Sequence, residues 1–318
     1  MASTHAIVES PPANAIPSKL RDYYALTKPE VNLLILMTTS AGFYLGSSGP
    51  LRMGRLLITL AGTLLVASGT ATLNQWMERG YDARMRRTAN RPLVSGRLKG
   101  REACWFGLAL SAAGGGLLAA SVNLVSALLA IGTLLGYLLV YTPLKRKTPL
   151  CTLLGAVPGA MPTLIGWAAA SGGIGRNAWL LFGVLFLWQF PHFLAIALLY
   201  REDYAAAGFR MLPGFDVDGR FTKAEIVVFA VVLVVVTILP GAGGSGAVYS
   251  LIMFIAGAFF VYHTAKLAVS SSRVMARVQK PGPCSCTASM LSGASWSGPR
   301  TVISAIPWAR SSLAVTAE

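Results

Sequence analysis

The chain has 318 residues, of which 54% are hydrophobic and only 12% are charged. Soluble domains carry roughly twice that charged fraction, so the composition excludes an ordinary soluble protein. The formal net charge is +15, but the Lys and Arg residues lie between apolar runs and not on one face of a soluble domain, which argues against a nucleic-acid partner.

Residues 1–25 contain acidic side chains and lack an apolar core, so they fit neither a signal peptide nor a transit peptide. We expect a cytoplasmic N-terminal segment there. The apolar runs that follow are long enough to cross a bilayer, which takes about 17 to 25 residues. They lie near residues 30–48, 56–76, 103–122, 124–141, 151–170, 178–200, 224–241 and 246–267. The sequence therefore predicts an all-α, polytopic transmembrane bundle with eight spans, within a domain of residues 26–269.

Basic residues gather in alternate connections between these runs. They precede the first span and follow the second, the fourth and the sixth. The positive-inside rule places such connections in the cytoplasm. We therefore expect a multi-pass protein of the bacterial inner (plasma) membrane, with a cytoplasmic N-terminus and cytoplasmic basic loops.

The end of the second span carries a regular polar pattern. Asn74, Glu78 and Asp82 are spaced by four residues and share one helix face. Carboxylates near lipid need a compensating cation, and Mg²⁺ is commonly held by one or two carboxylates together with substrate phosphates. Arg87 and Arg91 follow and can grip phosphate oxygens with two hydrogen bonds each. The pattern predicts a diphosphate site; the alternative is a charged exit segment whose ions serve topology alone.

A second polar group lies beyond the fourth and sixth spans. Lys145 and Arg146 end the motif that begins at Tyr141, and they fit either a diphosphate or a topology anchor. Asp203 follows the sixth span on the same side as Glu78 and Asp82, so we expect it to be an opposing metal ligand. Two acidic exits four helices apart indicate two four-helix halves around one cavity.

His192 lies one turn inside the sixth span, beside Pro191. A kink at the proline could turn the imidazole toward the cavity. The alternative is a histidine that hydrogen-bonds a neighbouring helix or relays a proton. A transporter would need ionisable groups near the bilayer midplane on broken helices, whereas the acids here lie at helix ends.

Residues 270–318 are rich in Ser, Pro and Gly and contain no run that could span a membrane. We expect an atypical, disordered or irregular tail there, in place of a final helix.

Together these motifs resemble the protohaem IX farnesyltransferase (haem O synthase) family, within the intramembrane aromatic prenyltransferase superfamily. The resemblance covers about residues 20–267. It rests on Leu26-Thr27-Lys28-Pro29, the run 74–93, residues 141–146 and 188–193, Asp203-Tyr204, Gly208 and Met211-Leu212-Pro213. The resemblance implies a bundle of about nine spans and transfer of farnesyl from farnesyl diphosphate to a vinyl group of haem B. The product would be haem O, for terminal oxidases.

The resemblance also implies roles for individual residues. Asn74, Glu78 and Asp82 would hold Mg²⁺ and diphosphate, with Asp203 on a further metal ion, and Asp82, Asp203 and His192 would form the catalytic group. Substrate binding would fall to Asn74, Arg87, Arg91, Tyr141, Lys145 and Arg146, and His192 would face haem or move a proton. A haem A synthase or a terminal oxidase assembly would be a further partner, besides the lipid bilayer.

Two departures from the pattern stand out. The wider superfamily often carries a second Asp four residues after the first in the later motif, where this chain has Ala207. The ninth span is also missing. Within the same class, a prenyltransferase acting on a quinone or another aromatic acceptor is the alternative, because the diphosphate motifs are shared.

Overall fold

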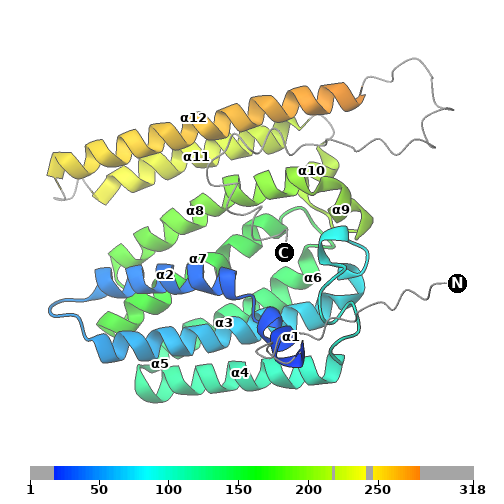
Figure 1. The fold of residues 1–318 in the computed structure, drawn as a ribbon. Coiled ribbons are helices and arrows are strands. Elements are labelled where there is room, and N and C mark those ends of the chain that lie inside the picture. Colours follow the sequence, from blue (N-terminus) through cyan, green and yellow to red (C-terminus); the bar gives the residue numbers. More distant parts are fainter. Residues whose placement is uncertain (1–17, 217–218, 241–245, 280–318) are drawn as a thin grey trace, which may run out of the picture.

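The computed structural model describes residues 18–216, 219–240 and 246–279, and this part of the chain is helical and contains no strand (Figure 1). The predicted all-α class is confirmed. The long helices are α2 (Pro29–Gly46), α3 (Met53–Asp82), α4 (Gly100–Ser121), α5 (Leu124–Leu135), α7 (Cys151–Ser171), α8 (Arg176–Leu199), α11 (Arg220–Pro240) and α12 (Gly246–Gln279). Shorter elements are α1 (Ser18–Leu26), η1 (Arg86–Thr88), η2 (Gly136–Tyr141), α6 (Thr142–Leu144), α9 (Arg201–Ala206) and α10 (Leu212–Phe215).

Seven helical segments in the described ranges are long and apolar enough to cross a membrane. They are Met53–Asp82, Gly100–Ser121, Leu124–Leu144, Cys151–Ser171, Arg176–Leu198, Arg220–Ile238 and Gly246–Lys266. The predicted first span corresponds to α2, which is present as a helix but is not among the seven, so the predicted number of eight is not confirmed. The third segment joins α5, η2 and α6 into one continuous helix.

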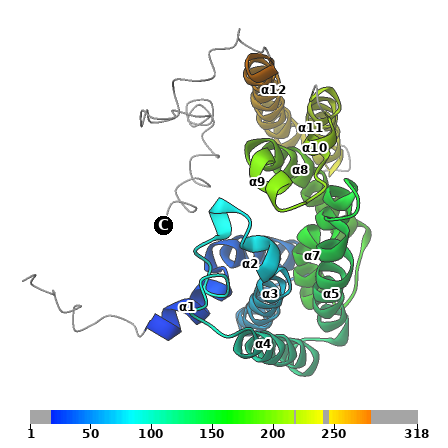
Figure 2. The same cartoon turned by 90° about the vertical axis from the view of Figure 1, so that its right-hand side faces the viewer.

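Seen end-on, the helices follow an arc that leads from α4 and α3 through α5, α7 and α8 to α11 and α12 (Figure 2). The central helix is α7, which contacts α2, α5 and α8. In its most apolar stretch of 18 residues 61% of the residues are buried, whereas none is buried in the corresponding stretch of α12. The helix α7 thus joins the helices before it to α8 and the helices after it; the division into two four-helix halves stays a prediction.

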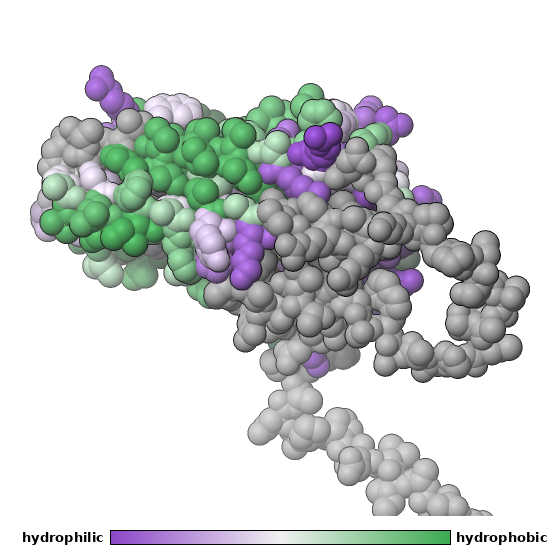
Figure 3. Space-filling model, turned by 90° about the horizontal axis from the view of Figure 1, so that it is seen from above, coloured by the Kyte–Doolittle hydropathy of each residue, from purple (hydrophilic) through white to green (hydrophobic). Residues whose placement is uncertain are grey.

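The surface of the bundle is apolar. Figure 3 looks onto α11 and α12, where hydrophobic residues cover much of the described face. Exposed side chains on α12 include Leu251, Phe254, Ile255 and Phe259. Soluble proteins rarely expose an apolar patch of this kind, so this face is suited to lipid.

Close backbone contact joins α2 to α7. A Cβ atom added at Gly166 would lie 2.0 Å from the carbonyl oxygen of Thr39, and one added at Gly42 would lie 2.3 Å from that of Thr163. Small residues let membrane helices approach closely without a hydrophobic driving force between them. This contact holds the C-terminal half of α2 against α7.

The basic connections lie together at one end of the bundle. The loop after α3, the turn after α6 and the short helix α9 all lie at that end, as the sequence predicts (Figure 1). The helix α12 continues past the predicted domain boundary at residue 269 and ends at Gln279. Residues 1–17 of the predicted N-terminal segment and residues 280–318 of the predicted tail lie outside the described residues.

Candidate active site

The last two turns of α3 carry a buried polar face. Asn74, Glu78 and Asp82 are 3%, 4% and 2% exposed. The Asn74 Nδ2 donates a hydrogen bond to Glu78 Oε2 at 3.2 Å. The spacing by four therefore brings the amide and the carboxylates together at the polar end of the bundle.

Two basic side chains neutralise these carboxylates. The Lys145 Nζ lies 2.5 Å from the Glu78 carboxylate, and the Arg91 Nη1 lies 2.5 Å from Asp82 Oδ2. A buried carboxylate without such a partner would carry a large desolvation cost. Lys145 and Arg91 thus meet the predicted acidic face directly.

Lys145 reaches the site because the helix before it changes to a π-helical turn and then ends. The π-helical turn η2 leads into Thr142 and Pro143, and the helix ends at Leu144. The Thr142 hydroxyl donates to Asn74 Oδ1 at 3.0 Å. π-Helical turns are rare and often occur at functional sites. This hydrogen bond fixes the end of α6 against the polar face of α3.

The connection between α8 and α11 is held over the same end. Met85, Ala207 and Phe209 form a small buried cluster. The backbone N–H of Arg210 donates to the Lys145 carbonyl oxygen at 3.0 Å, and the Lys145 Nζ lies 4.9 Å from the centroid of the Phe209 ring. The segment after α9 is therefore tied to both α3 and α6.

Arg87 and Asp203 also lie at this end. The Arg87 guanidinium carbon lies 4.9 Å from the centroid of the Tyr200 ring, which places Arg87 at the junction of α8 and α9. Asp203, in α9, is partly exposed and takes part in none of the ion pairs found in the described ranges. In the part of the chain that the structure describes, no group of three or more His, Cys, Asp or Glu side chains could hold a metal ion. The structure thus does not unite Asp203 with Glu78 and Asp82 as a ligand set.

The donor set of α3 itself fits Mg²⁺. It offers oxygen atoms from two carboxylates and one amide, and Mg²⁺ is commonly bound by one or two carboxylates plus substrate phosphates and water. Lys145 and Arg91 supply positive charge to the same carboxylates. Asn74, Glu78 and Asp82 would hold the ion together with its phosphate ligand.

His192 lies deeper in the bundle. It stacks on Trp188, with ring centroids 4.8 Å apart and an interplanar angle of 15°. On the same helix, Gln189 donates to the Ala156 carbonyl oxygen of α7, and Phe190 stacks on Phe229 of α11. Because successive residues are rotated by about 100° around a helix, Trp188 and His192 lie on the face of α8 opposite Phe190, and thus on the side away from α11.

Lys28 is a site residue to which the sequence analysis assigned no role. It lies between α1 and α2 with φ 50° and ψ 65°, the left-handed region. No other non-glycine residue in the described ranges has a positive φ. Asn32 Nδ2 donates to the Thr27 carbonyl oxygen and Gln75 Nε2 to that of Leu26, each at 2.8 Å. These two buried amides hold the turn in a conformation that costs an ordinary residue roughly 1 kcal/mol.

The turn brings the Lys28 ammonium group to the acidic face. Burial, together with the positive charges of Arg91 and Lys145, lowers the pKa of Lys28 to about 7, and the attraction of Asp82 and Glu78 only partly opposes this. The motif 26–29 was a signal that could have identified Lys28. Sequence alone did not show that the turn lies beside α3.

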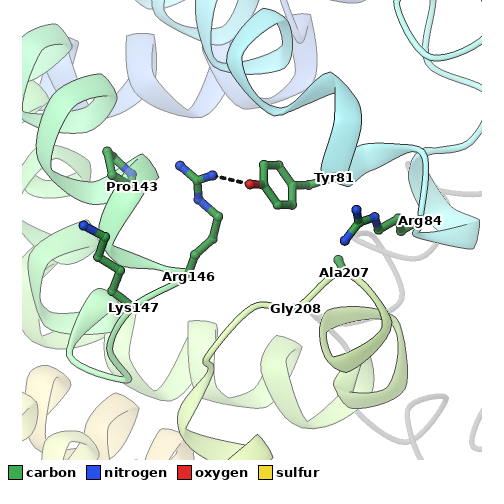
Figure 4. Close-up of a pocket in the computed structure, with 7 residues that line it drawn as sticks. All are labelled: Tyr81, Arg84, Pro143, Arg146, Lys147, Ala207 and Gly208. Atoms are coloured by element: carbon green, nitrogen blue, oxygen red, sulfur yellow. Dashed lines mark hydrogen bonds between the residues drawn. The ribbon is translucent and has the colours of Figure 1, made fainter.

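A separate pocket opens beside this site (Figure 4). Its volume is about 420 Å³. The Arg146 Nη1 donates to the Tyr81 hydroxyl oxygen at 2.6 Å, and its guanidinium carbon lies 4.6 Å from the ring centroid. Arg146 is therefore directed to Tyr81, whereas Lys145 is directed to Glu78. The lining residues are Tyr81, Arg84, Pro143, Arg146, Lys147, Ala207 and Gly208.

Comparison with known proteins gives matches over most of the chain. The model described as the UbiA prenyltransferase family matches residues 35–280. A protoheme IX farnesyltransferase of Solibacter usitatus (strain Ellin6076) is 48% identical over 268 residues, which cover 81% of this chain and 92% of the relative. Another from Salinibacter ruber (strain DSM 13855 / M31) is 43% identical over 246 residues, covering 77% and 87%.

Solved structures share the fold. A UbiA homolog from Archaeoglobus fulgidus bound to DMAPP and Mg²⁺ has a TM-score of 0.63 at 16% identity, covering 81% of this chain and 99% of that one. The structure of a digeranylgeranylglyceryl phosphate synthase has a TM-score of 0.67 at 19% identity, covering 82% and 95%. At such identities these likenesses concern the fold alone.

Proposed function

The chain belongs to the UbiA prenyltransferase family and is a membrane prenyltransferase, and we propose that it transfers farnesyl from farnesyl diphosphate to a vinyl group of haem B. The product is haem O. The acceptor is inferred from relatives that are up to 48% identical and named protoheme IX farnesyltransferase. The observation that carries the chemistry is the buried pair of carboxylates at the end of α3, each neutralised by a basic side chain.

The first task of the site is to bind the diphosphate. Asn74, Glu78 and Asp82 would hold a Mg²⁺ ion through their oxygen atoms, and the ion would supply positive charge to the diphosphate. Lys145 and Arg91, which hold the carboxylates in the free protein, are then available to phosphate oxygens. Charge-assisted bonds of this type are about twice as strong as neutral hydrogen bonds. The site therefore exchanges one set of ion pairs for another.

The second task is to stabilise the leaving group. Negative charge grows on the diphosphate as the allylic C–O bond breaks, and preorganised cations lower the free energy of that state. Arg91, Lys145, Arg87 and Lys28 surround the polar end of α3 and perform this role in the proposal. The electron-rich vinyl group then forms a C–C bond with the allylic carbon, and water adds to the resulting cation with loss of a proton.

His192 and Asp203 complete the proposed site. The imidazole of His192, stacked on Trp188, faces the porphyrin or moves the proton that water releases. Asp203, in α9, would hold a further metal ion, since α9 lies at the same end of the bundle as the end of α3. Tyr141, whose ring centroid lies 5.4 Å from Lys145 Nζ, positions that amine.

The proposal includes a location. The basic loops after α3, α6 and α8 face the cytoplasm of the bacterial inner membrane, as the positive-inside rule predicts. Farnesyl diphosphate then enters from the cytoplasm, and haem B enters from the bilayer. The product passes to a haem A synthase or a terminal oxidase assembly.

The direct test is transfer by the full chain in lipid nanodiscs. Farnesyl diphosphate and Mg²⁺ are supplied with either haem B or an aromatic quinone precursor, and the products are identified by mass. The proposal expects a product of haem B plus farnesyl plus water, and no prenylated quinone. Prenylation of the quinone alone would assign the chain to a different acceptor, and an Asp82→Ala variant controls for uncatalysed products.

A further inference from the structure

The pocket beside the active site carries positive charge without a matching acid. Arg84, Arg146 and Lys147 line it, and none of its lining residues is Asp or Glu. The ion pairs found in the described ranges involve none of these three cations. Like charges held around one space repel each other, so the pocket favours an anion.

The pocket is also organised around one aromatic ring. The guanidinium groups of Arg84 and Arg146 lie 5.8 Å and 4.6 Å from the Tyr81 ring centroid and approach it from two sides (Figure 4). The Tyr81 hydroxyl oxygen accepts the Arg146 hydrogen bond, which directs the hydroxyl proton toward an acceptor. Arg146 is partly buried and Arg84 is exposed, so the pocket has a fixed wall and an open mouth.

The charge of this pocket differs from that of the α3 site. At α3, buried carboxylates suit an anion that arrives with Mg²⁺. In the pocket the three cations have no carboxylate among the lining residues, which suits an anion that binds without a metal ion. Ala207, directly after α9, also lines the pocket and is fully buried, so this position contributes a methyl group and no charge.

We propose that the pocket formed by Arg84, Arg146 and Lys147 binds the carboxylate groups of the acceptor, which are the two propionates of haem B. This assignment rests on the proposed function. A porphyrin of this type carries its vinyl and propionate groups on opposite edges, so an acceptor whose vinyl group reaches the diphosphate site needs a separate anion subsite nearby. The pocket supplies that subsite, since Arg146 adjoins Lys145 in the chain.

Porphyrin binding tests the assignment without any transfer reaction. The full chain in phosphatidylcholine nanodiscs is titrated with zinc protoporphyrin IX and with its dimethyl ester, and binding is followed by fluorescence. The ester keeps the ring and the vinyl groups but lacks the two negative charges. The proposal expects the free acid to bind the wild type about tenfold more tightly than the ester does, because charge-assisted hydrogen bonds are lost with the ester.

Variants then locate the effect. Arg84→Gln combined with Lys147→Gln is expected to weaken the free acid about tenfold and to leave the ester unchanged. Ala207→Asp should weaken binding of the free acid more than Ala207→Asn does, because the two side chains have the same shape at this buried position and only Asp is charged. Arg176→Gln, an exposed arginine at the other end of α8, should change neither affinity.

Four outcomes would overturn the assignment. Equal binding of the acid and the ester by the wild type, or equal loss of both in the variants, would mean that the pocket does not recognise carboxylates. Weaker binding of Mg²⁺ and inorganic pyrophosphate by the double variant would make the pocket part of the diphosphate site. If neither porphyrin binds and haem B is not a substrate, the proposed function fails together with the pocket assignment. If neither porphyrin binds but haem O still forms, only the pocket assignment fails.

Discussion

Lys145 and Arg146 are neighbours in the chain, but their side chains enter two different sites. The Lys145 Nζ lies 2.5 Å from the Glu78 carboxylate, whereas the Arg146 Nη1 donates to the Tyr81 hydroxyl at 2.6 Å. Both acceptors belong to α3. The turn after α6 thus places one cation at the acidic face of α3 and the other in the pocket beside it.

The Lys145–Glu78 pair can be tested by a double-mutant cycle. Replacing Lys145 by Met leaves a buried carboxylate unpaired and should lower the free energy of unfolding by roughly 3–5 kcal/mol. Adding Glu78→Gln should restore most of that stability, because no buried charge remains. Transfer activity should stay at least about 100-fold below the wild type in all three variants. Thermal unfolding in detergent and initial rates are measured; additive losses of stability would contradict direct pairing.

Two variants of Lys28 distinguish the effect of the left-handed turn on stability from the effect of the amine on pyrophosphate binding. Lys28→Gly removes the strain of the left-handed turn and should stabilise the fold by up to about 1 kcal/mol, whereas Lys28→Met keeps the strain. Both variants should weaken binding of Mg²⁺ and inorganic pyrophosphate about tenfold, since both lose the ammonium group. Unfolding temperatures with and without pyrophosphate provide the measurement. A Lys28→Gly protein that binds pyrophosphate like the wild type would exclude a role for the amine.

The lowered pKa of Lys28 predicts a dependence of stability on pH. In the folded protein the amine loses its proton near pH 7, whereas in the unfolded chain it keeps the proton up to about pH 10.4. Between these values the unfolded state binds more protons, so stability rises with pH by at most about 1.4 kcal/mol per unit. From pH 7 to pH 9 the wild type should therefore gain stability relative to Lys28→Met. A constant difference between the two proteins would contradict the shift.

The contact between α2 and α7 gives a prediction about packing. Gly166→Ala should destabilise the protein and weaken pyrophosphate binding, because the new methyl group meets the Thr39 carbonyl oxygen at 2.0 Å and pushes α2, with the Lys28 turn, away from α7. Gly183→Ala, on α8, meets nothing within 4 Å and is the matched control. Unfolding temperatures of the two variants are compared. Equal effects would show that the close approach is unimportant.

The four-residue spacing was sufficient to predict the polar face of α3, because residues four apart on a helix lie on one side whatever their surroundings. Spacing could not predict the different contacts of Lys145 and Arg146, since the direction of each side chain depends on where the helix ends after η2 and Pro143. The role of Lys28 was not predicted, because it depends on a left-handed turn held by Asn32, one helical turn later, and by Gln75 of α3, which is distant in the sequence. Hydrophobic runs located the helices, but α2 does not count among the membrane-spanning candidates.

The role of Asp203 could be predicted from the sequence only in part. Its sequence position places it at the same end as Glu78, and the structure agrees on that end. A metal ion at Asp203 would depend on substrate phosphates that bridge Asp203 to the α3 carboxylates, and these phosphates are part of no sequence pattern. The role of Asp203 as a ligand therefore stays a prediction.

The haems that accumulate in membranes show directly whether the α3 carboxylates support farnesyl transfer to haem B. The intact chain or its Asp82→Ala variant is expressed in a bacterial strain that lacks haem O synthase, and haems are extracted from the membranes and identified by mass. The account predicts haem O with the intact chain and only haem B with the variant at equal membrane abundance. Haem O from both, or from neither although the intact chain is correctly inserted, would contradict it.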